Sequence, residues 1–109
     1  MCPSKTMKTY DTFTNIRGWA EARNLVLGSN PQAQFTKLIE EAGELATGIS
    51  KKRNDLVMDG IGDMAVVLTI LAAQHGVTIE QCIEMAWDEI KDRKGRMIDG
   101  VFVKEADLV

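Results

Sequence analysis

The chain has 109 residues, 45% of them hydrophobic and 27% charged, with a formal net charge of −3 at pH 7. This length and composition are typical of one globular domain with a modest core. The acidic balance excludes the broad basic surface with which proteins bind nucleic acid, so no nucleic-acid partner is expected. A nucleotide ligand is still compatible with this charge, because a bound metal ion can reverse its sign at one site.

The ends and the cysteines of the chain indicate a cytoplasmic protein. The polar segment Met1–Lys8 lacks the apolar core of a signal peptide, and residues 1–11 are expected to be flexible. The longest apolar run, Met64–Ala73, is about half as long as a bilayer requires, so no membrane association is expected. Cys2 and Cys82 form no Cys-x-x-Cys pair and are expected to be reduced.

Helices are predicted between short breaks at Gly, Pro and Asn. The first covers roughly Thr12–Leu25, and Gly28 begins the break that follows. Asn30-Pro31 is a helix start signal, because Asn is a favoured N-cap and Pro a favoured first residue. The second helix is therefore expected from Pro31 to about Lys52, with apolar residues at helical spacing and positive charge at its end.

Asn54 is expected to cap the third helix, which Gly76 ends. This helix is apolar nearly all round, which is typical of a helix packed on several sides. Thr78-Ile79-Glu80-Gln81 fits a capping box. The fourth helix is expected from Ile79 to about Lys94, closed by Gly95, before a tail over residues 96–109 that is irregular or extended around Gly100–Val103.

These elements predict a single all-α domain over residues 1–109, with a four-helix-bundle-like arrangement and short connections. One neighbouring layer is too little to cover the third helix on all of its apolar sides. A homodimer or homotetramer with sites between helices is therefore expected.

Carboxylates form two groups, Glu40, Glu41 and Glu44 in the second helix and Asp59 and Asp63 in the third. Offsets of three and four residues place each group on one helix face. Like charges about 5 Å apart repel by roughly 3 kcal/mol at an effective dielectric near 20. Mg²⁺ removes such repulsion and commonly bridges carboxylates to substrate phosphates. The pattern favours a Mg²⁺ site, with Mn²⁺ as a possible substitute; a solvated acidic face is the alternative for the glutamates.

Four glycines, Gly43, Gly48, Gly60 and Gly62, lie inside the second and third predicted helices. Each costs about 1 kcal/mol relative to alanine at such a position. Their number beside the acidic residues indicates that room is kept there, either for close helix approach or for ligand and water.

Two motifs resemble those of the MazG-like, all-α nucleoside triphosphate pyrophosphohydrolases. The string Glu40-Glu41-Ala42-Gly43-Glu44 matches the family's Glu-Glu-x-x-Glu motif, and Gly62-Asp63 matches the Gly-Asp ending of its second motif, Glu-x-x-Asp. The resemblance covers roughly Phe35–Arg96. It implies a helical MazG-type fold and the Mg²⁺-dependent cleavage of nucleoside triphosphates, often non-standard or deoxy forms, to the monophosphate and pyrophosphate.

By the same resemblance, Glu41, Glu44 and Asp63 are metal ligands, and Glu40, beside Glu41, orients or deprotonates the attacking water. One position departs from the family, whose second motif has a glutamate where this chain has Gly60. Asp59 is a possible substitute that rests on helical spacing alone, since it stands one turn before Asp63 but is rotated about 100° from the lost position. A shifted metal, a weak second metal and reduced activity all stay open. So does the alternative of a catalytically impaired helical module that binds nucleotides or a protein partner.

Basic and aromatic side chains have two interpretations each. Lys91 and Arg93 are candidates for nucleotide phosphate binding, as basic residues in this region are in the family, or they complement a helix dipole. Lys37 lies one turn before Glu41 and is expected to pair with it. Trp19 and Trp87 are expected in a core or an interface rather than stacked on a base.

Overall fold

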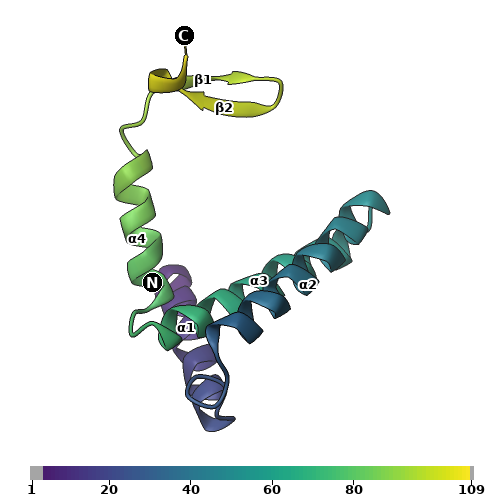
Figure 1. Ribbon diagram of the computed structural model, residues 1–109, viewed down its shortest axis with the longest axis vertical. Coiled ribbons are helices and arrows are strands. Elements are labelled where there is room, and N and C mark those ends of the chain that lie inside the picture. Colours follow the sequence, from purple (N-terminus) through teal and green to yellow (C-terminus); the bar gives the residue numbers. More distant parts are fainter. Residues whose placement is uncertain (1–3, 109) are drawn as a thin grey trace. The chain divides into compact units, whose positions relative to one another are not determined.

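The computed structural model describes residues 4–108, with the side chains of residues 12–108, and divides the chain into two compact units on either side of the Ile79–Glu80 bond. The first unit contains α1 (Ser4–Ala22), α2 (Pro31–Ser50) and α3 (Asn54–Gln74) (Figure 1). The second contains α4 (Ile79–Ile90), β1 (Gly95–Ile98), β2 (Val101–Lys104) and a short 3-10 helix, η1 (Glu105–Asp107). The predicted all-α class, with an extended C-terminal part, is confirmed.

Helix α1 starts earlier than its apolar stripe suggested. It begins at Ser4 rather than Thr12, so the backbone of residues 4–11 is helical. The predicted flexibility of residues 1–11 stays a prediction, and residues 1–3 lie outside the described residues. No Gly or Pro occurs between Ser4 and Arg17 to interrupt helical hydrogen bonding. The helix ends at Ala22, and Asn24 follows at φ 58°, a left-handed conformation that Asn tolerates better than most residues.

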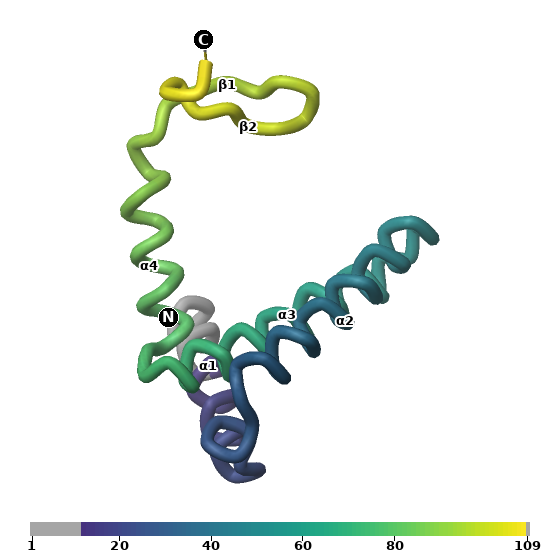
Figure 2. Tube along the Cα trace, in the orientation of Figure 1, coloured from purple at the N-terminus to yellow at the C-terminus, as the bar shows by residue number. Residues whose placement is uncertain are grey.

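Helices α2 and α3 run side by side as an antiparallel hairpin (Figures 1 and 2). Asn30 caps α2 as predicted, because its Oδ1 accepts a hydrogen bond from the Ala33 amide at 2.8 Å and Pro31 is the first helical residue. Helix α2 ends at Ser50, close to the predicted end. Arg53 rather than Asn54 takes the N-cap position of α3.

Two of the four helical glycines let α2 and α3 approach closely. A Cβ atom at Gly48 would lie 2.9 Å from Leu56 Cβ, and one at Gly60 would lie 3.0 Å from Leu45 Cβ and 3.1 Å from Leu45 Cα. All three distances are shorter than ordinary carbon contacts of about 3.5–4.0 Å. At Gly43 and Gly62, by contrast, a Cβ would have no neighbour within 4 Å.

The first unit has its core around α3. Val67, Ile70 and Ala72 of α3 are buried, together with Ala20 of α1. Thr69 is fully enclosed as well, and its hydroxyl donates to the Ala65 carbonyl at 2.7 Å, which satisfies the polar atom inside the helix. Part of the apolar surface of α3 is therefore used for packing within the first unit.

Helix α3 is also the one helix, among the described residues, that is long and apolar enough to cross a membrane by length and composition. This is weak evidence for a membrane span, because core helices of globular domains pass the same test.

The second unit differs from the prediction at the end of its helix. Helix α4 ends at Ile90 rather than near Lys94, and Gly95 begins β1 instead of closing the helix. Strands β1 and β2 pair antiparallel with Ile98 opposite Val101, so Asp99-Gly100 forms a two-residue turn (Figure 2). Asp99 and Gly100 have φ values of 50° and 81°, as a type I′ turn requires. Asp-Gly between two apolar runs is a hairpin signal, so the predicted extended segment is one strand of a hairpin.

Candidate metal centre

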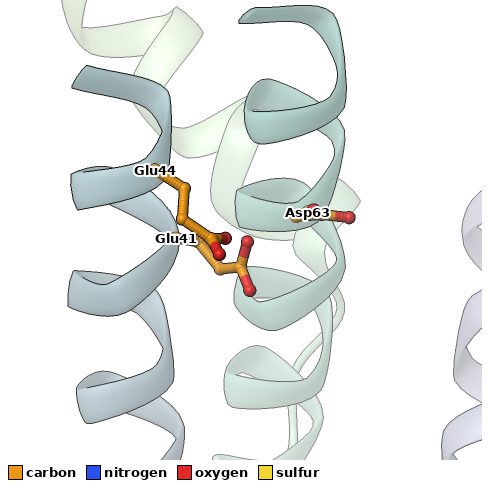
Figure 3. Close-up of side chains that lie close together, drawn as sticks. All are labelled: Glu41, Glu44 and Asp63. Carbon is orange, nitrogen blue, oxygen red and sulfur yellow. The ribbon is translucent and has the colours of Figure 1, made fainter. Parts of the chain in front are cut away.

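Three of the predicted acidic residues come together between α2 and α3. Glu41 and Glu44 stand one turn apart on α2, and Asp63 stands on α3. One carboxylate oxygen from each residue lies within 4.8 Å of the other two (Figure 3). Figure 3 shows the two glutamates extending from their helix toward the helix that carries Asp63. The close approach of the helices at Gly48 and Gly60 is what brings carboxylates from two elements this near to one another.

Glu41 is the most enclosed member of the cluster. Its relative exposure is 6%, whereas Glu44 is exposed and Asp63 is intermediate. The Oε1 atom of Glu41 lies 3.3 Å from Nζ of Lys37, the ion pair that the sequence predicted. The Oε2 atom is buried and has no hydrogen-bond partner. A buried carboxylate oxygen without a donor is costly, so this position favours a cation or a proton in the cluster.

The crowding of the three carboxyls shifts their pKa values in opposite directions. Burial raises the pKa of Glu41, but interactions with Glu44 and with Lys37 outweigh it, and the pKa lies below its ordinary value. Hydrogen bonding to Glu41 and the charge of Glu41 raise the pKa of Glu44. Burial and the charges of Asp59 and Glu41 raise the pKa of Asp63. Without a cation, the cluster therefore retains protons more readily than isolated carboxyls do.

The donor set fits a hard divalent cation. Mg²⁺ and Ca²⁺ take oxygen ligands at about 2.0–2.6 Å, so oxygens on opposite sides of one ion are separated by about 4–5 Å. The three oxygens lie within 4.8 Å of one another, which is compatible with that range. The unpartnered Oε2 atom of Glu41 favours a bound cation independently of the spacing of the three oxygens.

The remaining predicted acidic residues lie outside this three-residue cluster. Asp59 is exposed and lines a pocket of about 240 Å³ together with Glu44, Thr47, Leu56, Gly60 and Asp63. Its charge acts on Asp63, so it belongs to the same electrostatic neighbourhood. Glu40 is exposed on α2, beside Glu41 in sequence. It lies close enough to Lys37 to raise the pKa of that amine, after the larger effects of Glu41.

The packing of Gly60 leaves no room for a glutamate side chain, the residue that the family resemblance implies at this position. Gly60 is buried against Leu45, and even a methyl group at this position would lie 3.0 Å from Leu45 Cβ. A glutamate side chain could not enter this contact unless the α2–α3 hairpin opened. Within the described residues, the acidic side chains of α3 beside this position are therefore Asp63, which belongs to the cluster, and Asp59, which lines the adjoining pocket.

The two predicted phosphate-binding residues lie in the second unit. Lys91 follows α4, and its Nζ atom pairs with Asp88 at 3.2 Å, with both side chains partly or largely exposed. Arg93 is exposed between α4 and β1. Their assignment as nucleotide ligands stays a prediction.

Sequence reasoning considered Trp19 alone and did not connect it with the other α1 residues that lie beside the acidic cluster. Thr12, Asn15, Ile16 and Trp19 line a groove of about 490 Å³ together with Asp63 and Val66 of α3. The four α1 residues follow the spacing i, i+3, i+4 and i+7, so they share one helix face. This spacing could have predicted that the four side chains line one surface, but they mix polar and apolar types and therefore form no apolar stripe.

The comparisons with known proteins agree with this geometry. Residues 29–97 match the MazG nucleotide pyrophosphohydrolase domain, which is more than half of the chain, so the protein belongs to this family. It is similar to an uncharacterized 18.2 kDa protein from the rep-hol intergenic region of Haemophilus phage HP1, with 54% identity over 63 residues. That match covers 58% of this chain and 39% of the phage protein, so the chain spans less than half of its relative. No solved structure matches the chain.

Proposed function

We propose that the protein hydrolyses nucleoside or deoxynucleoside triphosphates to the monophosphate and pyrophosphate with the help of Mg²⁺. Membership in the nucleotide pyrophosphohydrolase family supports the reaction class. The observation that carries the metal dependence is the Glu41–Glu44–Asp63 cluster, with its enclosed and unpartnered Glu41 oxygen. An ordinary exposed acidic surface would leave that oxygen in contact with water.

The proposed roles follow from position and burial. Glu41, Glu44 and Asp63 hold the cation, and Asp59 contributes from the wall of the adjoining pocket. A bound divalent cation supplies positive charge to the phosphate chain and lowers the pKa of water. Glu40, exposed beside Glu41, accepts the proton of the attacking water while the water oxygen bonds to phosphorus and the bond to pyrophosphate breaks. Lys91 and Arg93 are proposed to bind phosphate oxygens.

A panel of ribo- and deoxynucleoside triphosphates, assayed for pyrophosphate with and without Mg²⁺, tests this function. Glu41→Gln and Asp63→Asn are expected to abolish Mg²⁺-dependent release while circular dichroism stays helical. Glu21→Gln is the matched control, because Glu21 is an exposed carboxylate on α1 outside the cluster. Unchanged turnover in both cluster variants, or no release by the unaltered protein with any substrate, would reject the proposal.

A second candidate function is nucleotide binding without hydrolysis. The buried Gly60 favours it, because the packing against Leu45 leaves the motif glutamate absent from the ligand set. Binding and turnover separate the two functions. Calorimetry would detect Mg²⁺-dependent nucleotide binding in both cases, whereas pyrophosphate appears only if the enzyme is active.

We also propose that the protein is a homodimer or homotetramer in which a second copy covers apolar surface on the α2–α3 hairpin. Phe35 and Ile39 of α2 are each 55% exposed, and Met58 and Ile61 of α3 are 66% and 57% exposed. Large exposed apolar areas on small proteins mark association surfaces. Sedimentation equilibrium at micromolar concentration is expected to show a multiple of 12.1 kDa, and a monomer would contradict the proposal.

A further inference from the structure

The second unit leaves its apolar side chains uncovered. Within its described residues, neither α4 nor either strand of the hairpin contains a buried residue. A helix of 12 residues and a two-stranded hairpin are each only marginally stable in water unless another element covers them. The family match ends at residue 97, so β2 and η1 lie beyond the part of the chain that family membership accounts for. The apolar surface of this unit therefore needs a partner.

One face of α4 is apolar, and the helix around it is acidic. Ile83, Trp87 and Ile90 follow the spacing i, i+4 and i+7, so they share this face, which we call the α4 stripe. Their exposed fractions are 52%, 58% and 48%. The helix carries four carboxylates and no basic residue, and Lys91, just after its end, pairs with Asp88. The α4 stripe is therefore an apolar surface in a negative electrostatic environment.

The hairpin presents a complementary surface. Ile98 is opposite Val101 and Arg96 is opposite Val103 across the two strands, so these four side chains share one face, which we call the hairpin face. Ile98 is 38% exposed and Val101 is 63% exposed. The strands contain two charged residues, Arg96 and Lys104, and both are basic. The hairpin face is therefore an apolar surface with a positive border.

We propose that the hairpin face of one copy docks on the α4 stripe of a second copy, and that the reverse contact forms at the same time across a two-fold axis. Apolar side chains meet on both sides, and the basic border of the hairpin meets the carboxylates of α4. Within one chain these two surfaces do not cover each other, since neither contains a buried residue.

A second copy fits this surface because one short segment contains both complementary halves. A two-fold contact of this kind closes after two chains, and each half is used twice. A stable interface takes about 20–30 residues from each partner, and residues 80–108 supply a segment of that size. The contact is separate from the association through the α2–α3 hairpin proposed above, and the two contacts together would produce a tetramer. It does not depend on the hydrolytic function.

Sedimentation equilibrium of the full chain tests the contact with a matched pair of variants. Val101 and Met97 are both 63% exposed but lie on opposite faces of the hairpin, since Val101 pairs with Ile98 and Met97 with Phe102. Val101→Ser is expected to raise the dissociation constant by about 10- to 100-fold, because each dimer loses two apolar contacts. Met97→Ser is expected to leave it nearly unchanged. Equal dissociation constants for the two variants, or a monomeric unaltered protein, would overturn the proposal.

Trp87 reports directly on the α4 stripe. The chain has two tryptophans, so Trp19→Phe leaves Trp87 as the single indole. Its emission is expected to lie at shorter wavelength when the second copy covers it, and to move to longer wavelength on dilution with the dissociation constant found by sedimentation. Emission that stays the same at every concentration would show that no second copy covers the stripe, and would refute the docking.

Salt tests the electrostatic part of the contact. An increase from about 0.1 M to about 1 M shortens the Debye length from about 10 Å to about 3 Å, which screens the attraction between the hairpin and α4. Arg96→Gln is expected to weaken association by about 2- to 30-fold at low salt and to reduce its salt dependence, because two ion pairs are lost in each dimer. Lys51→Gln, at an exposed cation in the first unit, is the control. An identical salt dependence in the two variants would contradict the proposed pairing of charges.

Discussion

The glycines of the α2–α3 hairpin allow a sharp test of how closely the two helices of the candidate metal centre pack against each other. Gly60→Ala and Gly62→Ala make the same chemical change two residues apart in α3. Alanine is favoured over glycine in a helix by about 0.4–1 kcal/mol. Gly62 has nothing within 4 Å of the added carbon, so Gly62→Ala is expected to stabilise the protein by about that amount.

At Gly60 the gain in helix propensity is outweighed by steric overlap between the added methyl group and Leu45. The added carbon would lie 3.0 Å from Leu45 Cβ and 3.1 Å from Leu45 Cα, which is about 0.4–0.5 Å closer than ordinary carbon contacts. One of these two atoms belongs to the backbone, so rotation of a side chain cannot relieve the contact. Overpacking of this kind costs about 1–3 kcal/mol, so Gly60→Ala is expected to destabilise the protein by about 1–2 kcal/mol after the helical gain.

Thermal unfolding at one protein concentration, followed by circular dichroism, measures the difference. For a domain near this size, about 1 kcal/mol shifts Tm by about 4–8 °C, so the two variants should lie on opposite sides of the unaltered protein. Gly48→Ala, which meets Leu56 Cβ at 2.9 Å, and Gly43→Ala, which meets nothing within 4 Å, repeat the comparison on α2. If Gly60→Ala were as stable as Gly62→Ala, the account of helix approach and of the missing motif glutamate would be wrong.

Three further predictions concern the cluster and the cap. Glu44→Gln is expected to raise Tm in the presence of chelator, because it removes a carboxyl whose pKa is raised by neighbouring carboxyls. In the unaltered protein Mg²⁺ is expected to raise Tm further, and Glu44→Gln is expected to abolish that rise. Glu44 and Asp63 have raised pKa values in the folded protein, so they keep their protons to a higher pH than in the unfolded chain. Without metal, their contribution to the free energy of unfolding is therefore expected to fall as pH rises through these raised pKa values. Over the same window Mg²⁺ affinity should increase, and calorimetry at several pH values would measure this; a flat profile would count against it. Asn30→Ala is expected to lower the free energy of unfolding by about 1 kcal/mol in denaturant titrations, because the Ala33 amide loses its 2.8 Å acceptor, whereas Asn30→Asp should cost much less.

Local chemistry explains most of what could be predicted about the helices. Asn30-Pro31 specifies the start of α2 through one side-chain hydrogen bond and one fixed dihedral angle, both within four residues of chain. The start of α1 was missed because residues 4–11 have no apolar stripe, and helical backbone needs none where no residue breaks it. The end of α4 differs from the prediction because residues 91–94 connect the helix to the hairpin that the Asp99-Gly100 turn closes, instead of extending the helix.

The sequence alone determined the residue types and the spacing of the acidic site. An offset of three residues places Glu41 and Glu44 on one helix face, because helical periodicity is a property of consecutive residues. The motif resemblance adds Asp63. Whether the two helices approach closely enough to share one cation was decided only by tertiary packing. Gly48 and Gly60 allow close packing because they face Leu56 and Leu45 on the other helix, and no local sequence pattern predicts which residues face them. The burial of the Glu41 oxygen and the groove beside Asp63 likewise arise from contacts between elements distant along the chain.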